Sequence, residues 1–227
     1  MTLASLPPWV DPVASYMWHK GVPATLHIAA VSVVASTLVG IVLGTLLTVR
    51  FLPLRGLIRL YIEVWRGLPI LVTIFLIYYG LPSVSHRFST LGAYAGAEIG
   101  LTLWGSAQVA EATRGAVQSI PREQHEAASA LGFGWVGRHV HVVVPQALRR
   151  LLPPLVGLLV NIIQNSTIAS LIGVTELLGT GQREVERLNY SSSDPHAFEI
   201  FGAVLAAFFV VSFPLTRLAA FLEKRLV

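Results

Sequence analysis

The residues of this sequence that could bind a solute or take part in chemistry are amides and carboxylates that lie inside apolar segments. Asn161, Gln164 and Asn165 follow one another at three- and four-residue spacing, which places them on one face of a helix. Asn161 stands ten residues beyond Leu151, about 15 Å along a helix and near the middle of a bilayer core about 30 Å thick. Polar groups at that depth need a partner or a water-filled cavity. We therefore weigh two interpretations equally, the lining of a solute path and hydrogen bonding between helices.

Gln108 and Glu111 are further candidates for the lining of a path, since both stand in an apolar segment. For Glu111, an ion pair with Arg114 three residues later is the favoured interpretation. Glu98 leaves two possibilities open: it attracts a cationic solute near the outer end of its segment, or it reaches interfacial water. These positions favour binding and passage of a polar solute over covalent chemistry.

Several kinds of catalysis and cofactor binding are not supported. The sequence has no cysteine, no Gly-X-X-X-X-Gly-Lys-Ser/Thr phosphate loop, no Gly-X-Ser-X-Gly elbow and no His-Glu-X-X-His helix. His139 and His141 are close, but no third ligand has a suitable spacing, so no metal site is expected. We predict a chain that is not an enzyme and holds no cofactor of its own.

Composition indicates a membrane protein. Hydrophobic residues make up 54% of the 227 residues and charged residues only 12%, about half the charged fraction of a soluble domain. The net charge of +4 is spread over segment edges and not clustered, which argues against nucleic acid as a partner. No linker or low-complexity run divides the chain, so we predict one domain over residues 1–227.

Hydropathy and length predict an all-α membrane protein with five transmembrane helices. The first is too long for the core of a signal peptide and should stay in the mature chain. Its small residues Ser32, Ser36, Gly40 and Gly44 recur every four positions, which favours close helix packing. The five expected spans cover residues 23–49, 57–82, 93–116, 151–174 and 198–222.

The distribution of basic residues predicts the orientation. Of 16 lysines and arginines, all but four fall on one side of the five-span arrangement. Cytoplasmic loops retain positive residues, so the N-terminus is expected outside and the C-terminus in the cytoplasm. The loop of residues 119–149, between the third and fourth helices, is then cytoplasmic. The four basic residues of the outer side are Lys20, Arg87, Arg183 and Arg187.

The cytoplasmic loop has a helix-forming stretch with defined ends. Glu126, Ala127 and Ala128 favour a helix, Gly132 can end it in a left-handed conformation, and Pro145 suits the start of the next helix. The sequence alone also allows an ordinary amphipathic connector here.

The spacing of Glu126-Ala127-Ala128, Gly132 and Pro145 resembles the EAA loop of ABC importer permeases. Val142 and Val144 stand where Ile and Leu are common in that family. The resemblance implies a coupling helix at about residues 122–133 that fits a groove on an ATP-hydrolysing subunit, so that ATP and Mg would be bound by the partner. It also implies the type I importer permease fold and alternating access.

The resemblance extends over nearly the whole chain and is to the polar amino acid branch of these permeases. It implies a multi-pass protein of the bacterial inner membrane whose partners are two ATPase subunits, a second permease copy or related chain, membrane lipid, an amino acid substrate and a solute-binding protein that meets the outer loop around residues 183–194. Asn165 replaces a frequent Lys, Gln108 a frequent Tyr, and Glu98 an apolar residue. An ion-coupled transporter is the alternative, although the paired repeats typical of that class are not evident. The matching stretches are residues 21–26, 61–69, 110–121, 165–167 and 172–177.

Overall fold

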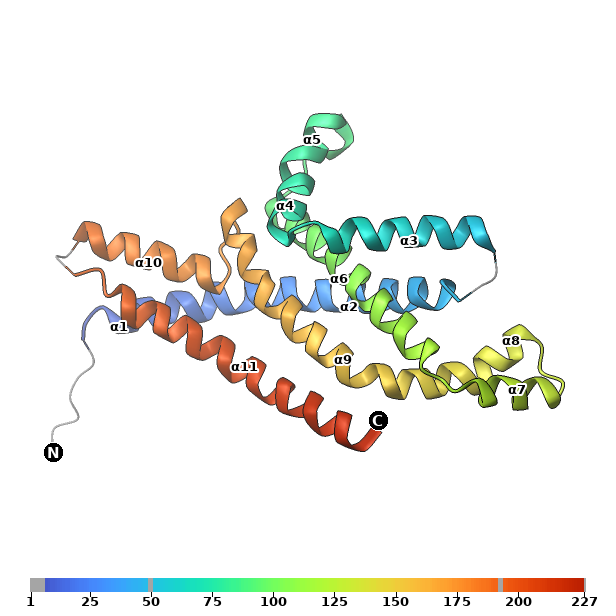
Figure 1. Cartoon of the computed structure of the whole chain (residues 1–227). Helices are drawn as coiled ribbons and strands as arrows, with labels where there is room; N and C mark the ends of the chain where they lie inside the picture. Colours follow the sequence, from blue (N-terminus) through green and yellow to red (C-terminus); the bar gives the residue numbers. More distant parts are fainter. Residues whose placement is uncertain (1–6, 49–50, 192–193, 227) are drawn as a thin grey trace.

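The computed structural model describes residues 7–48, 51–191 and 194–226, and within these ranges it contains helices and no strand (Figure 1). The chain begins with one long helical stretch, Val10–Leu46, made of α1 (Val10–Tyr16), a π turn (Met17–Gly21) and α2 (Val22–Leu46). The first span was expected to begin at residue 23, and it is longer because the helix continues through the preceding residues.

Three of the prolines that lie within helical stretches are preceded by a π turn, whereas Pro153, Pro154 and Pro214 lie inside α9 (Val144–Asn165) and α11 (Ala197–Leu226) without one. The turns Met17–Gly21, Leu76–Gly80 and His139–Val143 each end two residues before a proline. Proline has no N–H, and its ring clashes with the carbonyl four residues earlier, which in each case lies inside the π turn. The wider turn shifts the hydrogen-bond register locally, so that the helix continues. The prolines that follow the π turns are Pro23, Pro82 and Pro145.

The second expected span, residues 57–82, is not one straight helix. α3 (Leu52–Gly67) ends before an extended residue, Leu68, and the chain then turns by 108° into Ile70–Val84. This second arm contains α4 (Ile70–Phe75), the π turn Leu76–Gly80 and α5 (Leu81–Val84). Leu68 precedes Pro69, a position from which the helical conformation is disfavoured. The bend was therefore encoded locally, and the expectation of a single span overlooked it.

Helix α6 (Ala93–Gln118) lies at the centre and packs against α2, α3, α4 and α9. Its contact with α2 is close, since a Cβ at Gly40 would lie 2.5 Å from Cβ of Val109. The four small residues Ser32, Ser36, Gly40 and Gly44 are all buried, which confirms the predicted packing stripe. A 3-10 turn (His86–Phe88) precedes α6.

The second half of the chain is built on a helical stretch of 38 residues, Trp135–Ile172. It contains α8 (Trp135–Arg138), the π turn His139–Val143, α9 (Val144–Asn165) and a 3-10 segment (Ser166–Ile172). It is followed by α10 (Leu177–Ser191) and α11 (Ala197–Leu226). The expected outer loop around residues 183–194 is thus largely helix α10, which packs against the π turn Met17–Gly21 and α11.

Within the described residues, three helical stretches are long and apolar enough to cross a membrane, and the bent pair of residues 52–84 would make a fourth. The three are Val10–Leu46, Trp135–Ile172 and Ala197–Leu226. In Figure 1, α7 (Arg122–Ala130) and α8 lie at one end of the molecule, and α1 and α10 lie at the opposite end. Large apolar side chains are exposed between these ends, among them Leu38, Val42 and Leu205. Such a surface matches lipid.

Candidate coupling helix and solute path

Helix α7 ends in a hydrogen-bonded motif that depends on Gly132. The N–H of Gly132 donates to Ser129 O at 3.0 Å, and the N–H of Phe133 donates to Ala128 O at 3.1 Å. These two bonds form a Schellman motif, in which the residue directly after the C-cap of the helix, here Gly132, adopts a left-handed conformation. Gly132 has φ +85°, as the sequence predicted. A Cβ at this position would meet no atom within 4 Å, so the requirement for glycine is purely conformational.

The other residues predicted for coupling lie on or beside the same helix. Glu126 is exposed and pairs with Arg122, with Oε1 and Nε 2.8 Å apart. Ala127 is exposed, whereas Ala128 is only 2% exposed and faces the protein. Pro145 is exposed in the first turn of α9. The structure therefore places one face of α7 toward solvent and the face with Ala128 toward the protein.

Helix α7 is connected to the long stretch Trp135–Ile172 at two points. Gln146 Nε2 donates to Gln124 Oε1 at 3.2 Å, and Arg138 Nη1 donates to Ser129 Oγ at 3.0 Å. These bonds join α7 to the first residues of the stretch, whose later part contains the amides Asn161 and Gln164.

Aromatic and imidazole rings fill the space between α7 and α8. His139 is buried and stacks on Trp135 with ring centroids 4.0 Å apart, and His125 meets His139 edge-on at 6.3 Å. Burial lowers the pKa of His125 below its ordinary value of 6.5, and the positive charge of Arg138 and the neighbouring His139 lower this pKa further.

The candidates on α6, Gln108 and Glu111, face polar residues of α3. Arg66 Nε donates to Gln108 Oε1 at 3.3 Å, and the carboxylate of Glu111 lies 3.3 Å from Arg59 and 3.7 Å from Arg66. Glu111 also makes two bonds to Arg114, at 2.7 and 3.0 Å, which confirms the predicted pair. Three arginines thus surround one carboxylate at the α3–α6 contact.

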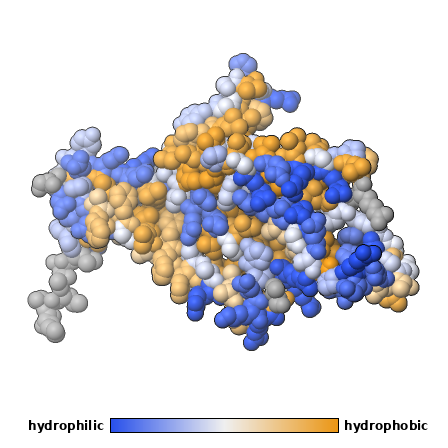
Figure 2. Space-filling model, viewed as in Figure 1, coloured by the Kyte–Doolittle hydropathy of each residue, from blue (hydrophilic) through white to orange (hydrophobic). Residues whose placement is uncertain are grey.

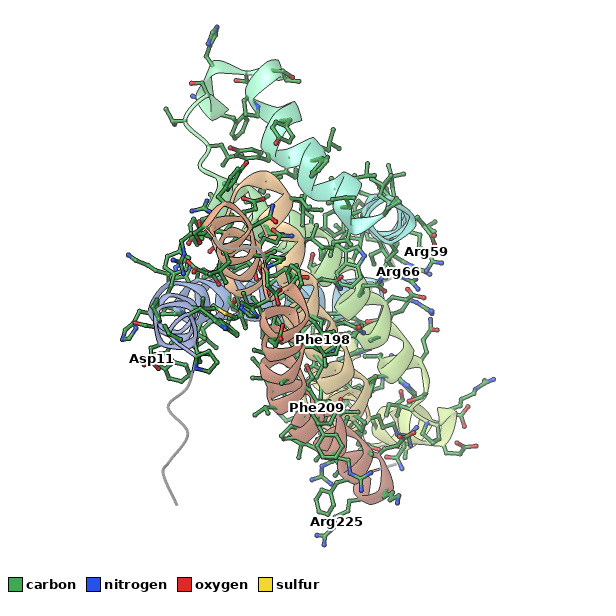
Figure 3. The ribbon with its side chains drawn as sticks, turned by 90° about the vertical axis from the view of Figure 1, so that its left-hand side faces the viewer. Asp11, Arg59, Arg66, Phe198, Phe209 and Arg225 are labelled. Atoms are coloured by element: carbon green, nitrogen blue, oxygen red, sulfur yellow. The ribbon has the colours of Figure 1, made fainter. Side chains whose placement is uncertain are left out.

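The polar side chains of α3 form a stripe of charge on an otherwise apolar region. Figure 2 shows a hydrophilic patch over α3 between hydrophobic areas, and Figure 3 shows Arg59 and Arg66 on the same side of this helix. Arg59 and Glu63 pair at 2.6 Å within the stripe. Because these groups are 37–55% exposed, the ion pairs contribute little stability and mainly fix side-chain positions.

The three amides of α9 have different surroundings. Gln164 Nε2 donates to Ser212 Oγ of α11 at 3.3 Å, which is the interhelical packing that was one of the two interpretations. Asn165 Nδ2 donates to the carbonyl of Asn161 at 2.8 Å within the same helix. The side chain of Asn161 is exposed. Among the described residues, no hydrogen bond joins these amides to Gln108 or Glu111, so the candidates form two separate groups.

A pocket adjoins Gln164 and Ser212. Its volume is about 580 Å³, and its walls come from α9, α10 and α11. One amide and one hydroxyl face a mainly apolar lining there, and the exposed side chains of Leu205 and Phe209 make the pocket an open groove. The lining residues are Gln164, Leu178, Phe201, Val204, Leu205, Phe208, Phe209 and Ser212.

Glu98 has a specific neighbour that the sequence did not reveal. Its Oε1 lies 2.9 Å from Nδ1 of His27 on α2, and the imidazole of His27 meets the ring of Tyr94 edge-on at 6.3 Å. The carboxylate is only 16% exposed. Glu98 therefore contacts His27, an arrangement that differs from both expected alternatives, the attraction of a cationic solute and contact with interfacial water.

The sequence reasoning also missed the role of Glu176. This side chain is fully buried, and its two oxygens accept hydrogen bonds from the N–H groups of Leu178 at 2.9 Å and Gly179 at 2.7 Å. Thr25 Oγ1 of α2 accepts from the N–H of Leu177 at 2.9 Å. These bonds satisfy the first turn of α10 and join it to α2. Glu176 stands directly before a segment with a helical pattern, and this position could have indicated a helix cap from the sequence.

These features define a helical membrane protein with a short, exposed helix at one end. The model of the family "Binding-protein-dependent transport system inner membrane component" matches residues 36–227. The chain belongs to this family, and it is therefore an inner-membrane component of a transport system.

Similar proteins include transporters with named substrates. The probable amino-acid ABC transporter permease protein PatM of Vibrio harveyi is 33% identical over 207 residues, which cover 91% of this chain and 90% of that protein. The octopine transport system permease protein OccM of Rhizobium radiobacter is 33% identical over 221 residues, 92% of this chain and 88% of that protein. The glutamate/aspartate import permease protein GltJ of Escherichia coli is 29% identical over 222 residues, 92% and 87% respectively.

Solved structures have the same fold. The crystal structure of an amino acid ABC transporter with histidines contains a chain with TM-score 0.82 and 27% identity, covering 97% of this chain and all of that one. An inward-facing MetNI methionine ABC transporter gives TM-score 0.74 at 19% identity, covering 98% and 100%, which shows the fold alone. The type I importer permease fold expected from the sequence is thereby confirmed.

Proposed function

We propose that this chain is the permease subunit of an ATP-driven ABC importer for polar amino acids. The observation that carries the proposal is α7, whose Schellman end at Gly132 and exposed Glu126 and Ala127 present a short helix at one end of the molecule. Family membership and the amino-acid permeases among the relatives support the substrate class. Neither supports the ion-coupled transporter that was the alternative.

The chain functions as a single domain, 1–227, with five spans, the N-terminus outside and the C-terminus in the cytoplasm. The bent arms of residues 52–84 together make the second span. The third is α6, which is long enough but carries Glu98, Gln108 and Glu111. These three residues place polar groups along α6, as expected of a helix at the centre of a polar pathway.

The solute path runs between the two polar groups described above. Asn161, Gln164 and Asn165 form one wall of the path, and Gln108 and Glu111 form the other. The two walls move relative to each other during transport. The hydrogen bonds Gln124–Gln146 and Ser129–Arg138 transmit displacement of α7 to the stretch Trp135–Ile172. The hydrogen bond between Gln164 and Ser212 transmits the same displacement to α11.

The partners follow from the same proposal. Two ATPase subunits bind the exposed faces of two coupling helices and hold ATP and Mg, because this chain has no phosphate loop. A second permease, identical or related, completes the pathway, since few spans are available to enclose it in one copy. A solute-binding protein delivers the amino acid at the opposite end, where α1 and α10 lie.

The test is copurification of the chain with an ATPase, followed by ATP hydrolysis and uptake in proteoliposomes with the loaded binding protein. We expect hydrolysis to rise with a polar amino acid and uptake to need ATP. Uptake driven by an ion gradient without ATP would instead support the ion-coupled alternative. Mass measurement of the intact complex should give two permeases for two ATPases, and a single permease per two ATPases would contradict the proposed assembly.

A further inference from the structure

A basic pocket lies where α2 ends, α3 begins and α6 ends, apart from the amide candidates on α9 and next to the candidate Glu111 of α6, which contacts two of its arginines. Its volume is about 420 Å³. Three of its seven lining residues are arginines and none is acidic. The lining residues are Leu47, Leu52, Arg55, Gly56, Arg59, Arg114 and Gln118.

Two of these arginines are held in place by the same carboxylate. Glu111 binds Arg114 through both oxygens, at 2.7 and 3.0 Å, and contacts Arg59 Nη1 at 3.3 Å. Arg114 also donates to the amide oxygen of Gln118, and within the described residues the NH₂ group of that amide makes no hydrogen bond. The ion pairs therefore orient the guanidinium groups without consuming every donor, because each guanidinium has five N–H groups.

The third arginine is unpaired. Within the described part of the chain, Arg55 makes no ion pair or hydrogen bond through its side chain, and the side chain is exposed. It stands in the first turn of α3, a helix of 16 residues whose N-cap residue, Phe51, makes no side-chain bond to that turn. Pro53 has no N–H, and the N–H of Arg55 donates to Phe51 O at 3.2 Å. The N–H groups of Leu52 and Leu54, together with the positive end of the helix dipole, therefore add to the charge of Arg55. Both favour an anion.

The neighbouring surface indicates where the rest of such a ligand lies. Leu52, Leu57 and Leu60 of α3 are 75%, 68% and 61% exposed. The charged stripe of α3 is thus bordered by an apolar surface on the same helix, which suits acyl chains next to a headgroup. Basic pockets between spans at the cytoplasmic side characteristically take anionic headgroups.

We propose that this pocket binds the phosphate group of an anionic phospholipid, with Arg55 as its main charged contact. The N–H groups of Arg59, the amide of Gln118 and the first turn of α3 complete the contacts to the phosphate oxygens. The acyl chains lie against Leu57 and Leu60. A bound lipid would hold α3 against α6 next to Gln108 and Glu111, so the lipid composition would affect the position of this wall.

The experiment measures lipid that stays bound to the full-length chain, purified with its partner subunits from nanodiscs of phosphatidylcholine alone or mixed with phosphatidylglycerol. Native mass spectrometry counts the retained lipids. We expect preferential retention of phosphatidylglycerol by the native chain and about fivefold weaker retention by Arg55→Gln. Arg149→Gln is the matched control, since Arg149 is an exposed arginine at the same end of the molecule but outside the pocket.

Equal retention of the two lipids by the native chain would overturn the proposal, and this comparison needs no variant. Equal loss in Arg55→Gln and Arg149→Gln would also overturn it, because the effect would then come from general surface charge. A third arm adds inorganic phosphate to the detergent-purified protein. Saturable phosphate binding together with no lipid preference would assign the pocket to a free anion and remove the lipid.

Discussion

Gln164 and Asn161 on α9 are both exposed, but Gln164 donates a hydrogen bond to Ser212 Oγ on α11 at 3.3 Å, whereas the side chain of Asn161, one turn earlier, is not bonded to another described residue. Two amides that looked equivalent in sequence therefore differ in their surroundings. Substitutions at the two positions should have different effects.

Gln164→Leu should lower the melting temperature of the assembled complex, by the equivalent of about 0.6 kcal/mol for a lost intramembrane hydrogen bond. Ser212→Ala should have a similar effect, and the double variant should be no worse than either alone, because both remove the same bond. Thermal unfolding of the three variants measures this. Additive losses would show that the bond contributes nothing.

Asn161→Leu should raise the amino acid concentration needed for half-maximal uptake and leave the melting temperature unchanged, because no hydrogen bond within the described residues is lost. Uptake of several amino acids by this variant gives its selectivity profile. A lowered melting temperature with unaltered selectivity would remove Asn161 from the candidate path.

Gly132→Val should reduce transport and substrate-stimulated ATP hydrolysis while insertion into the membrane persists. A β-branched residue at φ +85° costs about 1–2 kcal/mol, so the end of α7 should lose its Schellman bonds. Gly134→Val is the matched control, because Gly134 has an extended backbone (φ −66°, ψ 177°) that valine adopts readily. Equal activity of the two variants would contradict the role assigned to the turn.

Glu176→Ala should destabilise the complex by about 1 kcal/mol, the usual cost of a lost helix cap, and should loosen α10 in particular. Hydrogen exchange at the amides of Leu178 and Gly179 would report this locally. Glu186→Ala serves as the control, since Glu186 lies exposed on the same helix. Unchanged exchange in Glu176→Ala would show that the first turn of α10 does not need the carboxylate.

The α7–α8 contact should weaken in mild acid. Because the pKa of His125 lies below 6.5 in the folded protein, its neutral form stabilises the fold above pH 6.5, and this contribution is lost as the pH falls through the lower, folded-state pKa. The melting temperature should drop between pH 7.5 and 5.5, and His125→Gln should show a smaller drop. An equal drop in both proteins would assign the pH dependence to other groups.

Much of the fold and part of the site were predictable from local sequence. The end of α7 at Gly132 follows from the conformational freedom of one residue, and the packing of α2 on α6 follows from the absence of side-chain bulk at Gly40 and its neighbours. The break at Leu68 was also encoded, in the proline that follows it. In each case a property of a few consecutive or regularly spaced residues decides the outcome.

By itself, the sequence determined that the chain enters a membrane, which apolar segments form most of its long helices, and that a short helix ends at Gly132. Only the tertiary structure decided the 108° direction of the bend, the contact of Gln164 with Ser212, and the gathering of Arg59 and Arg66 around Glu111. Composition and periodicity act over a few turns of helix. Residues about fifty positions apart meet only through helix packing, which depends on the shapes of all the surfaces in contact.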